Sequence, residues 1–349
     1  MFVVATSVAS DLGGLAAALG PQARRDEPLA RYTAMRIGGP ADLLVVCETT
    51  GEVVGAVALA RQYGVPWLLL GGGCNVLVSD LGVRGLVIVN RAARIQFDGP
   101  LARAEAGALL ALLARETVER GLAGLEWAAG LPGTVGGAVV GNAGAFDGDV
   151  ASVLQGATVL GPDGETVECP NEWFEFDYRS SLIKRGARNT EHETRNTEHE
   201  TRNTKHETRN TKHETRSRRQ EAGGEGYIVL AATFGLRPGD PQALAARVDE
   251  ILEWRRTRHP AGATMGSTFK NPPGSHAGYL IEQAGLRGYR IGGAQISELH
   301  GNFFLNTGTA TAADVLALVE YACSEVRRQF GVELELEIEL VGEGWGNGA

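Results

Sequence analysis

The segment Gly121–Phe146 reads GLAGLEWAAGLPGTVGGAVVGNAGAF, and eight of its 26 residues are glycine. Glycine this dense weakens helices and strands. It is typical of backbone that approaches a ligand closely, with N–H groups directed at an anion. The segment lacks the Lys-Ser/Thr ending of a P-loop and the spaced glycines of a Rossmann turn. It therefore predicts a nucleotide cradle of another kind, and a packed turn region without a ligand is the alternative.

A second glycine cluster favours the ligand interpretation. Residues Val65–Asp80 read VPWLLLGGGCNVLVSD, in which two apolar runs flank three glycines and Asn75. This pattern predicts a strand, a sharp turn and a second strand. Two glycine-rich turns can converge on one extended ligand such as a dinucleotide.

Composition restricts the class of protein. The chain has 349 residues, enough for two domains, with 43% hydrophobic and 21% charged residues. Its net charge of −9 makes nucleic acid an unexpected partner. The apolar runs are too short to span a membrane, and the N-terminus makes a poor signal peptide. Four scattered cysteines without a CxxC pair indicate a reduced cytoplasmic protein without a structural metal.

Periodicity and capping signals predict the main elements. Strands are expected at ADLLVVCE, WLLL and YIVLAATFGL, and a hairpin at ATVLGPDGETVEC around Pro-Asp-Gly. The terminal VELELEIELVG alternates strictly, which predicts a strand with Leu334, Leu336, Ile338 and Leu340 on the core face. The opposite face carries Glu333, Glu335, Glu337 and Glu339, expected to be solvated with at most one functional member. Helices are expected at LGGLAAALG, GEVVGAVALARQYG, ALLALLARETVERG, DPQALAARVDEILEWRRTRHP, AGYLIEQAG and ATAADVLALVEYACSEVRRQFG.

Residues 189–216 consist of a seven-residue unit repeated four times, NTEHETR twice and NTKHETR twice. The unit has no apolar residue, so it offers no coiled-coil seam and no surface that could offset its ordering entropy. We expect residues 188–220 to form a disordered loop. Its regularly spaced histidines are a weak signal for metal binding.

Two further motifs carry polar side chains suited to chemistry. TMGSTFKNP places Ser267, Lys270 and Asn271 in a glycine-initiated turn, and YRSSLIK begins with Tyr178 and Arg179. No G-x-S-x-G elbow is present, and the histidines outside the repeat have no triad spacing. A serine without a histidine base suits proton donation or hydrogen bonding better than nucleophilic attack. Either motif alone could be an ordinary polar loop.

Seven motifs together resemble those of the UDP-N-acetylenolpyruvoylglucosamine reductase family, and their residues resemble those of its shorter, type II branch. The resemblance runs from Tyr32 to about Gly342, apart from the repeat. The motifs, in order, are YTAMRIGGPA, LLLGGGCNVLVSD, GLPGTVGGAVVGNAGA, YRSSLIK, GSTFKNP, AGYLIEQAGLRGYRIGGAQIS and FGVELELEIELVG.

The resemblance implies an α+β protein in which a two-part FAD-binding region, of the type shared with vanillyl-alcohol oxidase relatives, precedes an α/β substrate-binding domain. It suggests an N-terminal helix and connector at 1–30 and an FAD-binding region at 31–237, interrupted by the insertion at 188–220. A substrate-binding domain at 238–342 and a tail at 343–349 would follow.

The resemblance also implies noncovalent FAD between the two glycine clusters, reduced by NADPH. FAD would then reduce the enolpyruvyl ether of UDP-N-acetylglucosamine to UDP-N-acetylmuramate. Such an enzyme would be cytoplasmic and is expected to be a monomer. The residues expected to face the cofactor are Gly71, Gly72, Gly73, Cys74, Asn75, Gly133, Thr134, Gly137, Asn142 and Ala143.

The family's catalytic residues transfer onto three positions. By resemblance Arg179 and Glu337 polarise and stabilise the substrate carboxylate, and Ser267 delivers a proton to the adjacent carbon. The repeated ELELEIE leaves Glu335 and Glu339 open as substitutes for Glu337. Contacts to the substrate's diphosphate or sugar are expected from Tyr178, Lys270 and Asn271.

Two other functions stay open at this point. One is a different flavin oxidase of the same superfold whose flavin is covalently attached to a His or Cys side chain. Cys74 is the only candidate attachment residue that lies in a glycine turn. A small buried filler is the plainer interpretation of Cys74. The other is a nucleotide-binding module that has lost its chemistry, against which the joint presence of Ser267, Arg179 and a candidate glutamate argues.

Overall fold

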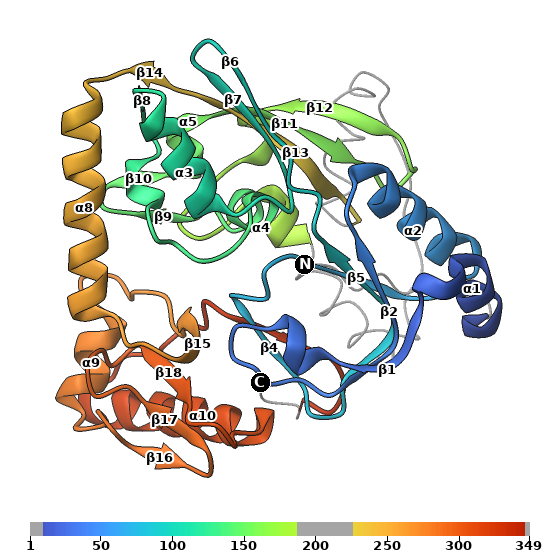
Figure 1. Ribbon diagram of the computed structural model, residues 1–349. Coiled ribbons are helices and arrows are strands. Elements are labelled where there is room, and N and C mark those ends of the chain that lie inside the picture. The colour runs from blue at the N-terminus through green and yellow to red at the C-terminus, as the bar shows by residue number, and fades with distance from the viewer. Residues whose placement is uncertain (1–9, 187–225, 346–349) are drawn as a thin grey trace, which may run out of the picture.

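The computed structural model describes residues 10–186 and 226–345. Three sheets of four or five strands dominate these ranges. Figure 1 shows the strands of the first two sheets in blue to yellow, whereas the third lies among the orange and red elements at the lower left. The heptad repeat at 189–216 lies outside the described residues, so its expected disorder stays a prediction.

The first sheet has the order β1-β2-β5-β3, with β2, β5 and β3 parallel and β1 antiparallel at one edge. Its strands are apolar because both faces are buried: Val45 enters the core under α2, whereas Leu44 enters a separate core on the other face. A capping box of Thr49 and Glu52 starts α2, which confirms the helix expected there. The members are β1 (Arg24–Pro28), β2 (Pro40–Cys47), β3 (Trp67–Leu70), β5 (Val83–Asn90), α1 (Leu12–Leu19) and α2 (Thr50–Gln62).

The second sheet is antiparallel throughout, in the order β12-β11-β13-β7-β6. The expected hairpin is confirmed as β11 and β12. Strand β13, the last of this sheet in chain order, inserts between β11 and β7. The strands are β6 (Ile95–Asp98), β7 (Leu101–Glu105), β11 (Leu154–Leu160), β12 (Thr166–Pro170) and β13 (Ile228–Gly235), and the adjoining helices are α3 (Leu110–Glu119), α4 (Val135–Val140) and α5 (Val150–Val153).

The third sheet is antiparallel, in the order β15-β18-β17-β16, and α10 packs against β16 and β17. Helix α8 (Pro241–Arg258), capped by Asp240, contacts α3 and runs from the second sheet toward the third (Figure 1). A left-handed Gly331 ends α10, as expected of a helix C-terminus. The other members are β15 (Ala263–Ser267), β16 (Arg290–Ile291), β17 (Ala294–Ile296), β18 (Phe303–Asn306), α9 (Ala277–Gln283) and α10 (Ala312–Phe330).

Short elements complete the described chain. Two-residue strands pair as β14 with β8 and as β10 with β9. The pairs are β8 (Leu122–Ala123) with β14 (Arg237–Pro238) and β9 (Gly144–Ala145) with β10 (Gly148–Asp149), and the 3-10 turns are Gly20–Gln22, Leu29–Tyr32, Glu126–Ala128 and Asn171–Phe174.

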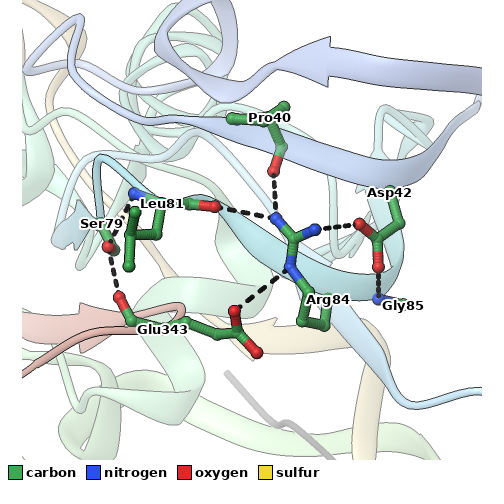
Figure 2. Close-up of polar contacts among 7 residues, drawn as sticks. All are labelled: Pro40, Asp42, Ser79, Leu81, Arg84, Gly85 and Glu343. Carbon is green, nitrogen blue, oxygen red and sulfur yellow. Dashed lines mark hydrogen bonds and ion pairs between the residues drawn. The ribbon is translucent and has the colours of Figure 1, made fainter.

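The last described residues of the chain return to the first sheet and to the strand beside the first glycine turn. Strand β19 (Glu339–Val341) pairs in parallel with β4 (Val76–Val78), the strand that follows the first glycine turn. Beyond it, Arg84 pairs with Glu343 at 3.5 Å and with Asp42, while Ser79 donates to the Glu343 carbonyl (Figure 2). These contacts hold the residues after β19 against the first sheet.

The expectation of one long terminal strand is therefore wrong. Only Glu339–Val341 forms a strand, because the chain changes partners: Leu336 bridges to Phe269 before β19 joins β4. The alternation of faces persists, with Ile338 buried in the C-terminal core. Within the expected tail at 343–349, Glu343 pairs with Arg84 and Trp345 packs against the C-terminal core.

Candidate active site

A cavity of about 2330 Å³ is lined by residues from two parts of the chain, 34–184 and 228–345. Both glycine clusters line it, together with Arg179, Ser267 and Glu337. The sequence-predicted catalytic residues thus lie on the wall of one space with the predicted cofactor turns. Most of its lining residues come from five segments of the chain: 69–76, 131–149, 176–184, 259–267 and 337–345.

The two glycine clusters meet at one wall of this cavity. A Cβ added to Gly71 would lie 2.5 Å from Thr134 Oγ1, and one added to Gly72 would lie 3.4 Å from the Gly133 Cα. Gly73 has φ +61°, and a Cβ there would lie 2.1 Å from the Tyr32 carbonyl oxygen. A side chain at Gly71 or Gly73 would thus collide with its neighbours, so the first turn presents bare backbone at these positions. Such a surface fits the extended diphosphate of FAD.

The remaining predicted cofactor residues follow Gly133 along α4 and its C-terminal turn. Gly137, Asn142 and Ala143 all line the cavity. Asn142 has a left-handed backbone with φ +42°. Its side chain bonds at both ends: Nδ2 donates to the Asp177 carbonyl at 3.1 Å, and Oδ1 accepts from the Ala151 N–H at 3.0 Å. Asn142 therefore ties this turn to the segment that carries Arg179.

Cys74 lies in the first glycine turn and lines the cavity. Its thiol donates to the Gly72 carbonyl at 3.3 Å, and burial raises the pKa of the thiol above its usual value. A thiol kept protonated is a poor nucleophile. This argues against Cys74 as a covalent flavin tether.

Two other segments hold the backbone around Glu337 in place. Its N–H donates to the Thr268 carbonyl at 2.9 Å, and its carbonyl accepts from Asn75 Nδ2 at 3.1 Å. The Glu339 N–H donates back to the Asn75 carbonyl at 3.0 Å. The backbone of Glu337 therefore lies between the first glycine turn and the segment that follows Ser267.

Arg179 faces Glu337 from a strained turn. Asp177 and Ser180 exchange backbone hydrogen bonds at 3.1 and 3.0 Å, and Arg179 within this turn has φ +54°. A left-handed arginine costs about 1–3 kcal/mol and is typical of functional sites. Its Nε lies 2.9 Å from Glu337 Oε1, with the two side chains 25% and 16% exposed. Tyr178, in the same turn, is 51% exposed, and its ring lies 5.6 Å from the Arg179 guanidinium carbon.

The alternating glutamates each have a cationic partner. The pairs are Glu335 with Lys270, Glu337 with Arg179, and Glu339 with Lys184, whereas Glu333 pairs with Arg327 on the surface. The expectation of a solvated face is thus wrong for Glu337 and Glu339, whose side chains are only 16% and 26% exposed. Both line the cavity, because the chain here runs between two packed regions rather than along an open edge.

The electrostatics distinguish Glu337 from its neighbours. Burial raises the pKa of this carboxyl, and the charges of Arg179, Lys184 and Lys270 oppose that rise. Desolvation is the largest of these effects, so Glu337 holds its charge less firmly than an exposed glutamate. Of the three open candidates, Glu337 is the one that pairs with Arg179.

Ser267 ends β15, where it pairs with Phe303 of β18. Its side chain lines the cavity, and its hydroxyl makes no hydrogen bond to another residue of the described ranges. A hydroxyl without an internal partner can donate to a ligand.

The two predicted substrate contacts beyond Ser267 differ. Asn271 lines the cavity, and its Oδ1 accepts from the Ala277 N–H at the start of α9 at 3.1 Å. Lys270 is not part of the cavity wall; its ammonium pairs with Glu335. The structure therefore brings Tyr178 and Asn271 to the cavity and leaves Lys270 beside it.

Sequence reasoning missed several residues of the wall. His259 lines the cavity, where burial first, then Arg255 and His300, lower its pKa to about 4. It is therefore neutral. Lys184, quoted within YRSSLIK but given no role, and Trp345 in the expected tail also line the wall. Of these residues, only Lys184 lies in a motif, YRSSLIK, that could have identified it from the sequence.

Comparison with known proteins agrees with this geometry. Residues 41–170 match the FAD binding domain, and residues 258–341 match the C-terminal domain of UDP-N-acetylenolpyruvoylglucosamine reductase. A reductase of that name from Rubrobacter xylanophilus is 42% identical over 93% of this chain and 97% of its own length. Another from Symbiobacterium thermophilum is 42% identical over 91% of this chain and 92% of its own.

A solved structure is also similar. The crystal structure of the reductase from Thermus caldophilus is 33% identical, with a TM-score of 0.69, and the match covers 91% of this chain and 99% of that one. Fold, cradle and sequence together define an FAD-dependent oxidoreductase. More specifically, the chain belongs to the UDP-N-acetylenolpyruvoylglucosamine reductase family. No helix of the described residues is long and apolar enough to cross a bilayer.

Proposed function

We propose that this cavity reduces UDP-N-acetyl-3-O-(1-carboxyvinyl)glucosamine to UDP-N-acetylmuramate, with Arg179, Glu337 and Ser267 as the catalytic residues. The observation that carries the proposal is the position of the Arg179–Glu337 pair, 2.9 Å apart, on the wall shared with Ser267 and the glycine cradle. The reaction is that of UDP-N-acetylmuramate:NADP⁺ oxidoreductase. The glycine turns at 71–73 and 133–137 would hold FAD, which would supply hydride chemistry between NADPH and the enolpyruvyl substrate when bound.

Arg179 and Glu337 act on the substrate carboxylate. Hydride addition to a double bond conjugated with a carboxylate spreads negative charge onto that carboxylate, so a fixed cation lowers the barrier. The strained turn and the Glu337 pair hold the Arg179 guanidinium in one orientation before substrate arrives. Preorganised charge of this kind needs no rearrangement during the reaction.

Ser267 supplies the proton that completes the reduction. The carbon next to the carboxylate must gain a proton after the hydride has added to its neighbour. Ser267 offers a hydroxyl proton from the cavity wall, and no histidine base is assigned to it. Tyr178 and Asn271, also on the wall, suit contacts to the diphosphate or the sugar.

The wider role follows from the product. UDP-N-acetylmuramate is a peptidoglycan precursor, so the proposal places the enzyme in the cytoplasm, in cell-wall biogenesis, and hence in the maintenance of cell shape and in cell division. A monomer is proposed, because one chain supplies the cradle, Arg179, Ser267 and Glu337 to one cavity.

Purification followed by anaerobic titration tests the function. The protein should be yellow, and acid precipitation should release the flavin as FAD. NADPH should bleach the flavin band, and the enolpyruvyl substrate should restore it with formation of UDP-N-acetylmuramate, detected by mass spectrometry. Colour that stays with the precipitate would favour a covalent flavin oxidase. A colourless protein that cannot be reconstituted with FAD would contradict the proposal.

A further inference from the structure

Four arginine and lysine side chains of the described residues line the cavity, and carboxylates neutralise three of them. The three pairs are Arg84 with Asp42 and Glu343, Arg179 with Glu337, and Lys184 with Glu339. The fourth cation is Arg255 of α8, which has no carboxylate partner in the part of the chain that the structure describes. Arg255 is therefore the member of this set whose charge the protein leaves uncompensated.

The guanidinium of Arg255 is also poorly solvated. Its Nε is buried and makes no hydrogen bond within the described residues, and Nη2 reaches the Trp127 carbonyl only at a long 3.5 Å. Burial lowers the pKa of Arg255, with no carboxylate opposing that change. A buried charge without a partner is costly, so proteins normally pair it. Because no described carboxylate meets this charge, an anionic ligand is the partner that its chemistry suits.

The Phe146 ring supports the Arg255 guanidinium on the cavity wall. The guanidinium carbon lies over this ring, 5.3 Å from its centre, and the ring packs edge-on against Trp254 at 5.0 Å. Phe146 and Asp147 form the turn of the β9–β10 hairpin with φ +48° and +62°, a strained conformation that is typical of functional sites. A guanidinium stacked on an aromatic face keeps N–H groups at its edge, where they can bind an anion.

We propose that Arg255 is an anion-binding residue of this cavity that contacts a phosphate of the nucleotide ligands, either the diphosphate of the UDP-sugar or a phosphate of NADPH. The planar fork of arginine matches phosphate oxygens in pairs. Arg179 is already assigned to the substrate carboxylate, and the glycine turns are assigned to the FAD diphosphate, so the anions left for Arg255 are these phosphates. Helix α8 leads from Arg255 into β15, which ends at Ser267. This inference rests on the proposed function and names a ligand contact within the same cavity.

The test is ligand binding to the oxidised, FAD-loaded enzyme, in which neither NADP⁺ nor the enolpyruvyl UDP-sugar is turned over. Titration of each ligand, followed by the flavin absorbance, gives its Kd. Arg255→Gln removes the charge, so at least one Kd should rise by about 10-fold to 100-fold, the scale of a hydrogen bond to a charged group. A rise for the UDP-sugar alone assigns its diphosphate to Arg255, a rise for NADP⁺ alone assigns the dinucleotide, and a rise for both assigns one shared phosphate position.

The matched control is Arg256→Gln on the same helix. Arg256 is 72% exposed and pairs with Glu253 away from the cavity wall, so both Kd values should stay within about twofold of wild type. FAD content and thermal midpoint, measured on every variant, report cofactor loss and folding separately. Should Arg255→Gln fail to fold, Arg255→Met, which keeps the apolar stem against Phe146, decides by the same titrations.

Two results would overturn the inference. One is a folded Arg255→Gln or Arg255→Met enzyme that binds both ligands as tightly as wild type. The other is a variant that loses FAD while its reconstituted form binds both ligands normally, since the phosphate at Arg255 would then belong to the cofactor. A wild-type enzyme that binds both ligands but does not reduce the UDP-sugar would instead contradict the proposed function.

Discussion

Replacing Glu337 with glutamine is expected to impair substrate reduction far more than the same change at Glu335. Glu337 is 16% exposed and pairs with Arg179 in the cavity. Arg179 Nε and Glu337 Oε1 lie 2.9 Å apart, a separation at which two unit charges interact by about 6 kcal/mol at an effective dielectric of about 20, which sets an upper scale for the effect. Loss of one preorganised group that stabilises a transition state costs about 10²–10³ in rate, or about 2.7–4 kcal/mol. We therefore expect Glu337→Gln to slow reoxidation of the flavin by at least about 100-fold.

The matched control is Glu335→Gln. Glu335 is 64% exposed, and an exposed ion pair contributes only about 0–1 kcal/mol, so the loss should not exceed about fivefold. Both variants should retain FAD. Stopped-flow absorbance of the reduced enzyme mixed with enolpyruvyl substrate measures the rate. If the two variants lose similar activity, or Glu335→Gln loses more, the assignment of Glu337 as the catalytic member is wrong.

Three further predictions follow from single features. Gly71→Ala should weaken FAD retention, because the new Cβ would lie 2.5 Å from Thr134 Oγ1. The control Gly55→Ala, which has open space around the new Cβ, should retain FAD normally. Equilibrium dialysis of FAD against each variant compares the two. The pKa of His259 is lowered to about 4 in the folded protein, so the unfolded state binds a proton more readily there. The free energy of unfolding should therefore fall as the pH drops from 6.5 toward 4. Urea unfolding of His259→Phe should show a flatter loss of stability across that window, and an unchanged slope would contradict this. Replacing residues 189–216 with a short Gly/Ser linker should leave melting temperature and turnover nearly unchanged; a loss above about 2 kcal/mol would exceed the effect of loop length.

Local sequence signals were sufficient to predict most of the helices and strands. The helix α2 carries a capping box at Thr49, α10 ends at a left-handed Gly331, and the Pro-Asp-Gly turn fixes the β11–β12 hairpin. Each signal lies within a few residues of the structure it specifies. The glycine clusters likewise predicted turns that line the cavity, because a missing side chain is visible in the sequence itself.

Contacts between distant segments could not be predicted in the same way. Asn75 donates to the Glu337 carbonyl across 262 residues, and β19 joins β4 in parallel over a similar separation. Alternation in the terminal segment gives the face of each glutamate but not its partner. The choice among Glu335, Glu337 and Glu339, and the burial of Lys184, depend on where the YRSSLIK segment packs, which periodicity does not encode.

The rate of proton delivery in Ser267→Ala tests the account of the site most directly. The substitution keeps the β15 backbone and removes the only group assigned as proton donor. Stopped-flow absorbance should show flavin reduction by NADPH at a near-normal rate, and reoxidation by the enolpyruvyl substrate slowed by about 100-fold or more. Ser267→Cys should retain more activity than alanine, since a thiol can still donate. If alanine slows both half-reactions equally, or neither, Ser267 is not the acid and the assigned chemistry of this cavity is contradicted.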